Sequence, residues 1–293
     1  MKKAIVKIVK GFSLFLGLFS IVIISAVLWP MPTIDVPETH TAIFIKSINV
    51  IDTETGNILK NRDVLIEGNT IHSIDSTSSV KSSKKSFVIN GKGKYLIPGL
   101  WDMHTHSNQH SPWLHHPLYI ANGVTGVRDM SGTLDKKDSY WVGSNERLRW
   151  NNELLNTTRI TPRYVLQSSY QIDGKSSVPS NSPSFFSLEN TSDVSMFLDF
   201  YKKEKIDFIK VYQQIKPNSY RKLAIEAPKY GMHLAGHKPM FLSLEEAVNL
   251  GQKSFEHGRI FMFESFSQAD SLKNPKNWKK FYSKSKKKDT FRL

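Results

Sequence analysis

The sequence predicts an α/β protein that has an apolar helix at its N-terminus. From about Leu96 onward, short apolar runs typical of buried strands alternate with segments typical of helices. Between about Thr41 and Tyr95, shorter β-runs are separated by turns that contain Gly and Asn, which indicates a small β-rich unit. The length of 293 residues is enough for one large domain and one small domain.

The first 30 residues indicate a membrane segment. Lys2, Lys3, Lys7 and Lys10 form a basic start, and residues 11–29 are uncharged and long enough to cross the hydrocarbon core as a helix. This stretch is long for a signal peptide, and no small-residue cleavage site follows it. We predict an uncleaved anchor with its lysines in the cytoplasm and the soluble part outside, in the periplasm or extracellular space. Secretion after signal cleavage is the alternative.

Composition limits the kinds of site that the chain can form. It contains no cysteine, so disulfides and thiolate metal sites are excluded. Any transition metal must then be held by histidine, carboxylate or a modified lysine. The formal net charge of +14 suggests either an anionic partner or a lysine-rich, solvated surface. We favour the second interpretation and expect no nucleic-acid partner, because no zinc finger or RNA-binding signature accompanies the basic runs.

The part of the chain after Leu96 contains the predicted α/β elements. Six strands are expected, at Leu100–His104, Val124–Arg128, Arg163–Gln167, Phe208–Val211, Met232–Ala235 and Ser254–Glu256. Helices are expected at Ser144–Leu155, Phe197–Lys205 and Leu244–Leu250. The last of these helices begins with a capping box, in which Ser243 and Glu246 satisfy each other's backbone amides.

Candidate metal ligands lie near the ends of these strands. Side chains two residues apart on a strand share a face, so His104 and His106 are able to grip one metal ion. Lys210, His237 and His257 each lie near the end of another short strand. Other interpretations remain for the last three: a strand-end lysine paired with a carboxylate, replacement of His237 by His233, and a structural histidine at position 257.

The region from about Thr41 to Gly258 resembles the amidohydrolase superfamily of metal-dependent hydrolases. It is most similar to the imidazolonepropionase-like and Xaa-Pro dipeptidase-like branch. The most specific match is the run Ile97–His106. Weaker matches follow in the family's order and spacing, at Gly123–Asp129, Phe208–Tyr212, Ala235–His237 and Phe255–Gly258. The resemblance implies a TIM (β/α)8-type barrel, here incomplete, with a small N-terminal β-sandwich domain beside it.

The resemblance also implies the roles of the candidate residues. His104 and His106 would hold one divalent ion, and His237 and His257 would hold a second. Lys210, carbamylated by carbon dioxide, would bridge the two ions as an anion. The metal would be zinc on family grounds, although nitrogen and oxygen ligands also suit Mn, Co or Fe. Arg128 would contact either the substrate or a neighbouring carboxylate.

The predicted organisation is a membrane segment at 1–30, a linker at 31–40, a β-sandwich at 41–95, a partial hydrolase barrel at 96–265 and a basic, disordered tail at 266–293. A full barrel needs eight strands, and only six are found. The family's late-strand aspartate, which binds metal and acts as a base, is also not found. The sequence therefore looks like a truncated hydrolase, and we assign no catalytic residue.

The predicted function is metal-dependent hydrolysis of a C–N bond in an amide, cyclic amide or dipeptide through a metal-activated water, with reduced activity. The expected partners are a small-molecule or dipeptide substrate and, through the N-terminal helix, a membrane. One alternative is a non-catalytic metal-binding remnant of such an enzyme. Another is a basic protein that binds membrane surfaces or polyanions.

Overall fold

The computed structural model describes residues 2–29, 34–36, 38–76, 86–132, 140–167, 171–175 and 185–258, together with residues 260, 264, 271, 274 and 277. The chain divides into two compact units, Met1–Asp35 and Val36–Leu293. Most of the predicted basic tail, 266–293, lies outside the described residues.

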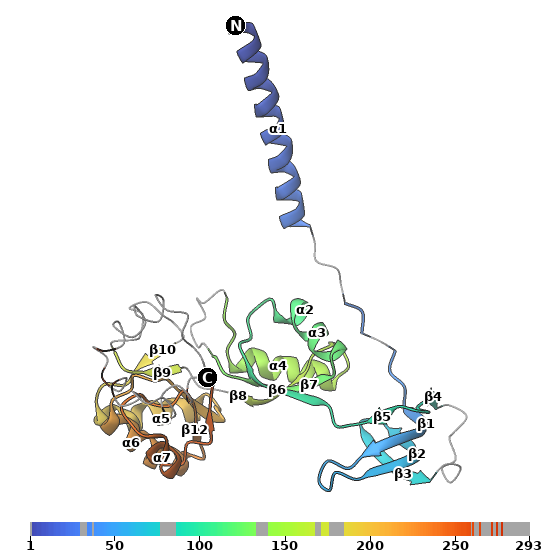
Figure 1. Cartoon of the computed structure of the whole chain (residues 1–293), viewed down its shortest axis with the longest axis vertical. Helices are drawn as coiled ribbons and strands as arrows, with labels where there is room; N and C mark the ends of the chain where they lie inside the picture. Colours follow the sequence, from blue (N-terminus) through green and yellow to red (C-terminus); the bar gives the residue numbers. More distant parts are fainter. Residues whose placement is uncertain are drawn as a thin grey trace. The chain divides into compact units, whose positions relative to one another are not determined.

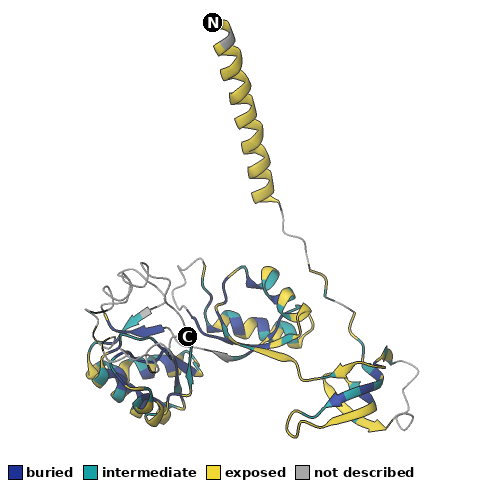
Figure 2. Ribbon diagram, in the orientation of Figure 1, coloured by how far each residue is buried: buried dark blue, intermediate teal, exposed yellow. Residues whose placement is uncertain are grey.

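The first unit is the helix α1, Lys2–Leu28. Its described side chains, those of residue 3 and of residues 5–28, are exposed (Figure 2). Residues Ile5–Leu28 are long and apolar enough to span a membrane, a property that membrane anchors and signal sequences share. The N-terminal helix is therefore present as predicted, and its role as an uncleaved anchor remains a prediction.

The second unit begins with a five-stranded sheet (Figure 1). Its strands are β1 (Ala42–Ile51), β2 (Ile58–Glu67), β3 (Thr70–Ser76), β4 (Phe87–Asn90) and β5 (Tyr95–Leu96). The strands β2 and β3 are antiparallel neighbours in the order β3-β2-β1-β4, and β5 also pairs with β1. Both β4 and β5 run parallel to β1, one after the other along the same edge, so the described strands form one layer. The two-layer β-sandwich expected from the sequence remains a prediction.

A three-stranded parallel sheet follows, in the order β6-β7-β8. Its strands are β6 (Leu100–Thr105), β7 (Val124–Asp129) and β8 (Arg163–Gln167), and its helices are α2 (Ser111–Leu114), α3 (His116–Ala121) and α4 (Ser144–Leu155). The buried side chains Val127, Trp150 and Tyr164 form the core of this part.

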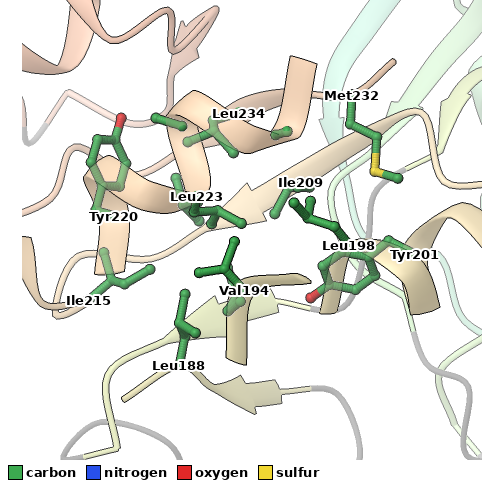
Figure 3. Packing of buried hydrophobic residues seen from close by; sticks show 14 of the residues in the cluster. Leu188, Val194, Leu198, Tyr201, Ile209, Ile215, Tyr220, Leu223, Met232 and Leu234 are labelled. Atoms are coloured by element: carbon green, nitrogen blue, oxygen red, sulfur yellow. The ribbon is translucent and has the colours of Figure 1, made fainter. Parts of the chain in front are cut away.

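The remaining strands form a second parallel sheet, in the order β10-β9-β11-β12-β13. They are β9 (Gln171–Asp173), β10 (Phe185–Ser187), β11 (Phe208–Val211), β12 (His233–Gly236) and β13 (Ser254–Phe255). The helices are α5 (Val194–Lys203), α6 (Pro217–Glu226) and α7 (Leu244–Asn249), with short 3-10 helices η1 (Thr191–Asp193) and η2 (Ala227–Tyr230). Figure 3 shows the main hydrophobic core, in which Leu198 and Leu223 from the helices pack with Ile209 and Leu234 from the sheet.

The six strands and three helices predicted after Leu96 are all present, with ends shifted by up to three residues. The mixed α/β class is therefore confirmed. The described strands form two parallel sheets, and no pairing joins β8 to β9. The incomplete barrel thus remains a prediction.

Candidate metal centre

The sequence-predicted ligands all lie at the C-terminal ends of parallel strands. His104 is the penultimate residue of β6, and His106 directly follows this strand. Lys210 lies in β11, His237 follows β12, and His257 lies two residues after β13. In parallel sheets, side chains at the carboxyl ends of the strands point to one common site, which is where ligands bind.

Glu256 is the side chain that joins the two sheets at this site. Its Oε2 atom lies 2.8 Å from Nδ1 of His104. Its Oε1 atom accepts hydrogen bonds from Arg128 at 2.6 Å and from Ser254 at 2.7 Å. Arg128, itself buried, also donates through Nε to the carbonyl of Met103 at 2.7 Å. These bonds connect β6, β7 and the end of β13 around one carboxylate.

The carboxylate of Glu256 is held in its charged form. Burial by itself would raise the pKa of Glu256, but the hydrogen bonds from His104 and Ser254 and the positive charge of Arg128 outweigh burial and lower this pKa to about 2. A charged carboxylate requires a proton on the facing nitrogen, Nδ1 of His104. In the neutral ring, the other nitrogen of His104, Nε2, then presents a lone pair.

This Nε2 atom of His104 faces the Nε2 atom of His106, at a distance of 3.2 Å. Two imidazoles that bind one tetrahedral zinc ion, with Zn–N bonds of about 2.05 Å, have their nitrogens about 3.3 Å apart. The same distance suits a hydrogen bond from one ring to the other. The pair is therefore spaced for one shared cation or one shared proton.

The surrounding side chains partly desolvate the ring of His106, and this lowers its pKa below the usual value although the residue as a whole is exposed. Asp129 opposes this shift, whereas His104, Lys210 and His257 add to it whenever they carry a positive charge. A neutral imidazole is the form that binds metal. The surroundings of His106 thus favour the ligating form of its side chain.

The histidine after β13 reaches this site through an unusual backbone conformation. His257 has a φ of +66°, in the left-handed region that few residues other than glycine adopt. Its ring centroid lies 4.7 Å from that of His104 and 5.0 Å from that of His237. The residue with the left-handed backbone is thus the one whose ring contacts histidines of both sheets. Local strain of this kind often marks functional sites.

Lys210 is fully buried and lies close enough to His106 to act on it electrostatically. Burial, opposed by Glu256 and aided by the charge of Arg128, lowers the pKa of its amine to about 8. The strand register places Lys210 opposite Ala235 and Val211 opposite Gly236. A Cβ atom at Gly236 would lie 2.3 Å from the carbonyl oxygen of Val211 and 3.0 Å from Cδ of Lys210. Only glycine therefore fits beside this lysine.

The five predicted residues thus come together, but their roles as ligands remain a prediction. Among the described residues, no group of three or more His, Cys, Asp or Glu side chains is arranged to hold a metal ion. The donors that the structure brings closest together are the nitrogens of His104 and His106. An all-nitrogen pair with one orienting carboxylate suits zinc, whose histidine ligands commonly donate their second N–H to a carboxylate.

Glu256 was not singled out from the sequence. Its only local signal is its position next to His257, because its partner His104 is 152 residues away in the chain. Arg128, predicted to contact either substrate or a carboxylate, is bonded to Glu256 in the structure. A substrate role for Arg128 remains a prediction. Asp129 pairs with Arg147 at 3.1 Å and accepts a hydrogen bond from the backbone of Ser131.

Sequence comparison finds relatives that act on C–N bonds, according to their names. No protein-family model matches the sequence. The chain is 27% identical to an adenine deaminase of Staphylothermus marinus over 218 residues, which are 69% of this chain and 33% of that protein. It is 41% identical to a 5-methylthioadenosine/S-adenosylhomocysteine deaminase of Halothermothrix orenii over 69 residues, 22% of this chain and 16% of the relative. The chain thus matches a third or less of the length of these relatives.

Comparison with solved structures finds proteins whose fold is similar to that of this chain. A bottromycin amidohydrolase matches with a TM-score of 0.57 and 20% identity over 74% of this chain and 43% of its own. A Xaa-Pro dipeptidase with methionine bound in its active site matches with a TM-score of 0.53 and 17% identity over 86% of this chain and 71% of its own. At sequence identities of 20% and 17%, these matches establish a similar fold and nothing about activity.

Proposed function

We propose that this chain, which belongs to the amidohydrolase superfamily, uses the five clustered residues to hydrolyse a C–N bond with the help of divalent metal. The observation that supports this most directly is the 3.2 Å approach of the Nε2 atoms of His104 and His106, with Nδ1 of His104 bonded to Glu256. His104 and His106 would hold one cation, and His237 and His257 a second. Zinc is the cation that best suits these donors.

A divalent cation bound there would polarise the substrate and lower the pKa of water. Within the protein, Glu256 fixes the proton of His104 on Nδ1, so Nε2 would be the atom that holds a cation. Arg128 keeps Glu256 charged and in place through their ion pair. An orienting carboxylate of this kind raises the basicity of the ligand and fixes its tautomer.

Lys210 would serve the same centre as a carbamate. A lysine with a pKa of about 8 has an appreciable fraction of neutral amine near neutral pH. The neutral nitrogen attacks carbon dioxide, a C–N bond forms, and one proton leaves to solvent. The product is an anion, which relieves the cost of burying an ammonium next to divalent cations.

The substrate class follows from the kind of bond that the relatives' names imply. Hydrolysis adds water across a C–N bond: the oxygen joins the carbon, and the nitrogen leaves with the proton. The reaction proposed for this chain is the cleavage of an amide, cyclic amide or amidine-like bond in a small molecule or dipeptide. The helix α1 would hold the protein at a membrane, with the remainder outside the cytoplasm.

The test is turnover by the purified full chain after addition of zinc. The panel contains Xaa-Pro dipeptides, cyclic amides and aminopurines, and release of the amine or ammonia is measured. The proposal predicts metal-dependent turnover of at least one class and its loss in His106→Ala. Metal binding without turnover of any class would point to a non-catalytic metal-binding protein.

A further inference from the structure

Beside His106 lies a group of aromatic side chains that the proposed hydrolysis does not use. The indole of Trp141 meets the imidazole of His106 edge-on, with ring centroids 6.0 Å apart. Tyr140 meets Trp141 edge-on at 4.8 Å, and His110 contacts both Tyr140 at 6.2 Å and Trp113 at 5.4 Å. We call His110, Trp113, Tyr140 and Trp141 the aromatic cluster.

The backbone fixes the position of this cluster relative to His106. An isolated antiparallel bridge pairs Asn108 with Trp141, and the amide of Gln109 donates to the carbonyl of Tyr140 at 2.9 Å. The side-chain amide of Asn108 also donates to the hydroxyl of Tyr140 at 3.1 Å. Val142, which follows Trp141 in the chain, is buried in the core that contains Val127 and Trp150. The two aromatic residues are therefore tied to the loop that directly follows His106.

The rings of Tyr140 and Trp141 keep solvent-exposed surface despite their contacts with each other and with His106. Tyr140 is 46% exposed, Trp141 is partly exposed and His106 is exposed. Exposed aromatic surface beside convergent polar groups is typical of ligand-binding sites. Aromatic rings prefer edge-to-face or offset-stacked partners with centroids about 4.5–7 Å apart. A flat ring carried by a ligand meets this requirement, whereas a saturated ring offers no π-system.

We propose that the aromatic cluster binds a planar aromatic or heteroaromatic ring of the substrate, next to the C–N bond that is cleaved. This inference rests on the proposed function, because it places the reacting bond at His104 and His106. Trp141 is the central residue, since it alone in the cluster contacts His106. The site would therefore discriminate between planar and saturated substrates of equal size.

Two matched amides test the inference. N-benzoylglycine carries a planar ring, and N-cyclohexanecarbonylglycine carries a saturated ring with the same number of carbons. Their affinities for the full chain in detergent, with and without zinc, are measured by titration calorimetry. We expect the benzoyl compound to bind about three- to tenfold more tightly, the range typical of aromatic pairing.

Variants assign the preference to the cluster. Trp141→Leu removes the π-system and should make the two affinities equal, while Trp141→Phe should retain the preference. Trp101→Leu is the matched control, because Trp101 is 54% exposed on β6 and lies outside the cluster. Equal affinities in the unaltered protein, no binding of either compound, or a preference that survives in Trp141→Leu would each overturn the inference.

Turnover of the same two amides separates this inference from the proposed function. A planar preference in binding, with no turnover of these amides or of any compound in the panel above, would support the ring site and refute the hydrolase proposal. Hydrolysis of both amides with equal binding and equal rates would support the hydrolase proposal and remove the ring site.

Discussion

The carboxylate of Glu256 and the imidazole of His104 form a 2.8 Å contact across 152 residues of chain, and this contact joins the two parallel sheets at the candidate metal centre. It fixes which ring nitrogen of His104 faces His106. We expect Glu256→Gln to weaken zinc binding about 10- to 100-fold, as is typical when a carboxylate that orients a ligand is removed. Competition with a chelating dye measures this affinity.

The control for this variant is Glu226→Gln. Glu226 is a surface carboxylate that pairs with Lys222 and Lys229 and contacts none of the candidate ligands in these ion pairs. Equal zinc affinities of the two variants would contradict the orienting role of Glu256. Far-UV circular dichroism checks that both variants are folded.

Lys210 should become carbamylated in the presence of carbon dioxide. With 13C-labelled bicarbonate, NMR should show a carbamate signal that is lost in Lys210→Met. The signal should grow as pH rises through about 8, because the neutral amine is the reactive form. Lys238→Met should retain it, since the amine of buried Lys238 donates to the carbonyl of Leu242 at 2.6 Å and pairs with Glu264 at 2.9 Å. A signal that persists in Lys210→Met would refute the assignment.

Gly236 should be intolerant of substitution. Gly236→Ala places a methyl group 2.3 Å from the carbonyl oxygen of Val211 at a φ of +129°, and we expect a loss of about 3 kcal/mol or more in the free energy of unfolding. Gly251→Ala is the matched control: its φ is +90°, but nothing lies within 4 Å of the added methyl group. That control should lose only about 1 kcal/mol in urea unfolding. Similar losses for both variants would show that the crowding beside Lys210 is unimportant.

His116 should make stability depend on pH. It is fully buried, and its Nε2 atom bonds to the hydroxyl of Tyr164 at 2.8 Å. Burial, aided by the charges of Arg159 and His115, lowers the pKa of His116 from 6.5 to about 3. Between these values the unfolded chain binds a proton that the folded chain excludes, so the free energy of unfolding falls as pH falls from 6.5 toward 3.

The slope due to His116 should approach about 1.4 kcal/mol per pH unit. His116→Gln should flatten the profile within this window. Urea titrations at a series of pH values provide the measurement. An unaltered profile in His116→Gln would contradict the buried, neutral state of this histidine.

The sequence predicts the local features of this fold well. Alternation along a strand places His104 and His106 on one side, and the capping of α7 by Ser243 is visible in four residues of sequence. These features depend on neighbours in the chain. The same holds for Lys210, whose apolar flanks mark a buried strand end.

Features that depend on distant partners were not predicted. The bond from Glu256 to His104 requires the order of two sheets, and the +66° φ of His257 follows from how the chain leaves β13. The β-bridge between Asn108 and Trp141 joins residues that are far apart in the chain, and no sequence motif predicts it. The incomplete barrel expected from the resemblance would need a strand pairing between the two parallel sheets that the described residues do not form, and it remains a prediction.

The most direct test of the central claim is the metal content of the purified full chain, measured by plasma mass spectrometry after growth with zinc. The account predicts stoichiometric divalent metal that is lost when His104 and His106 are both replaced by alanine. Metal-free protein, or metal content unchanged by the double replacement, would contradict it.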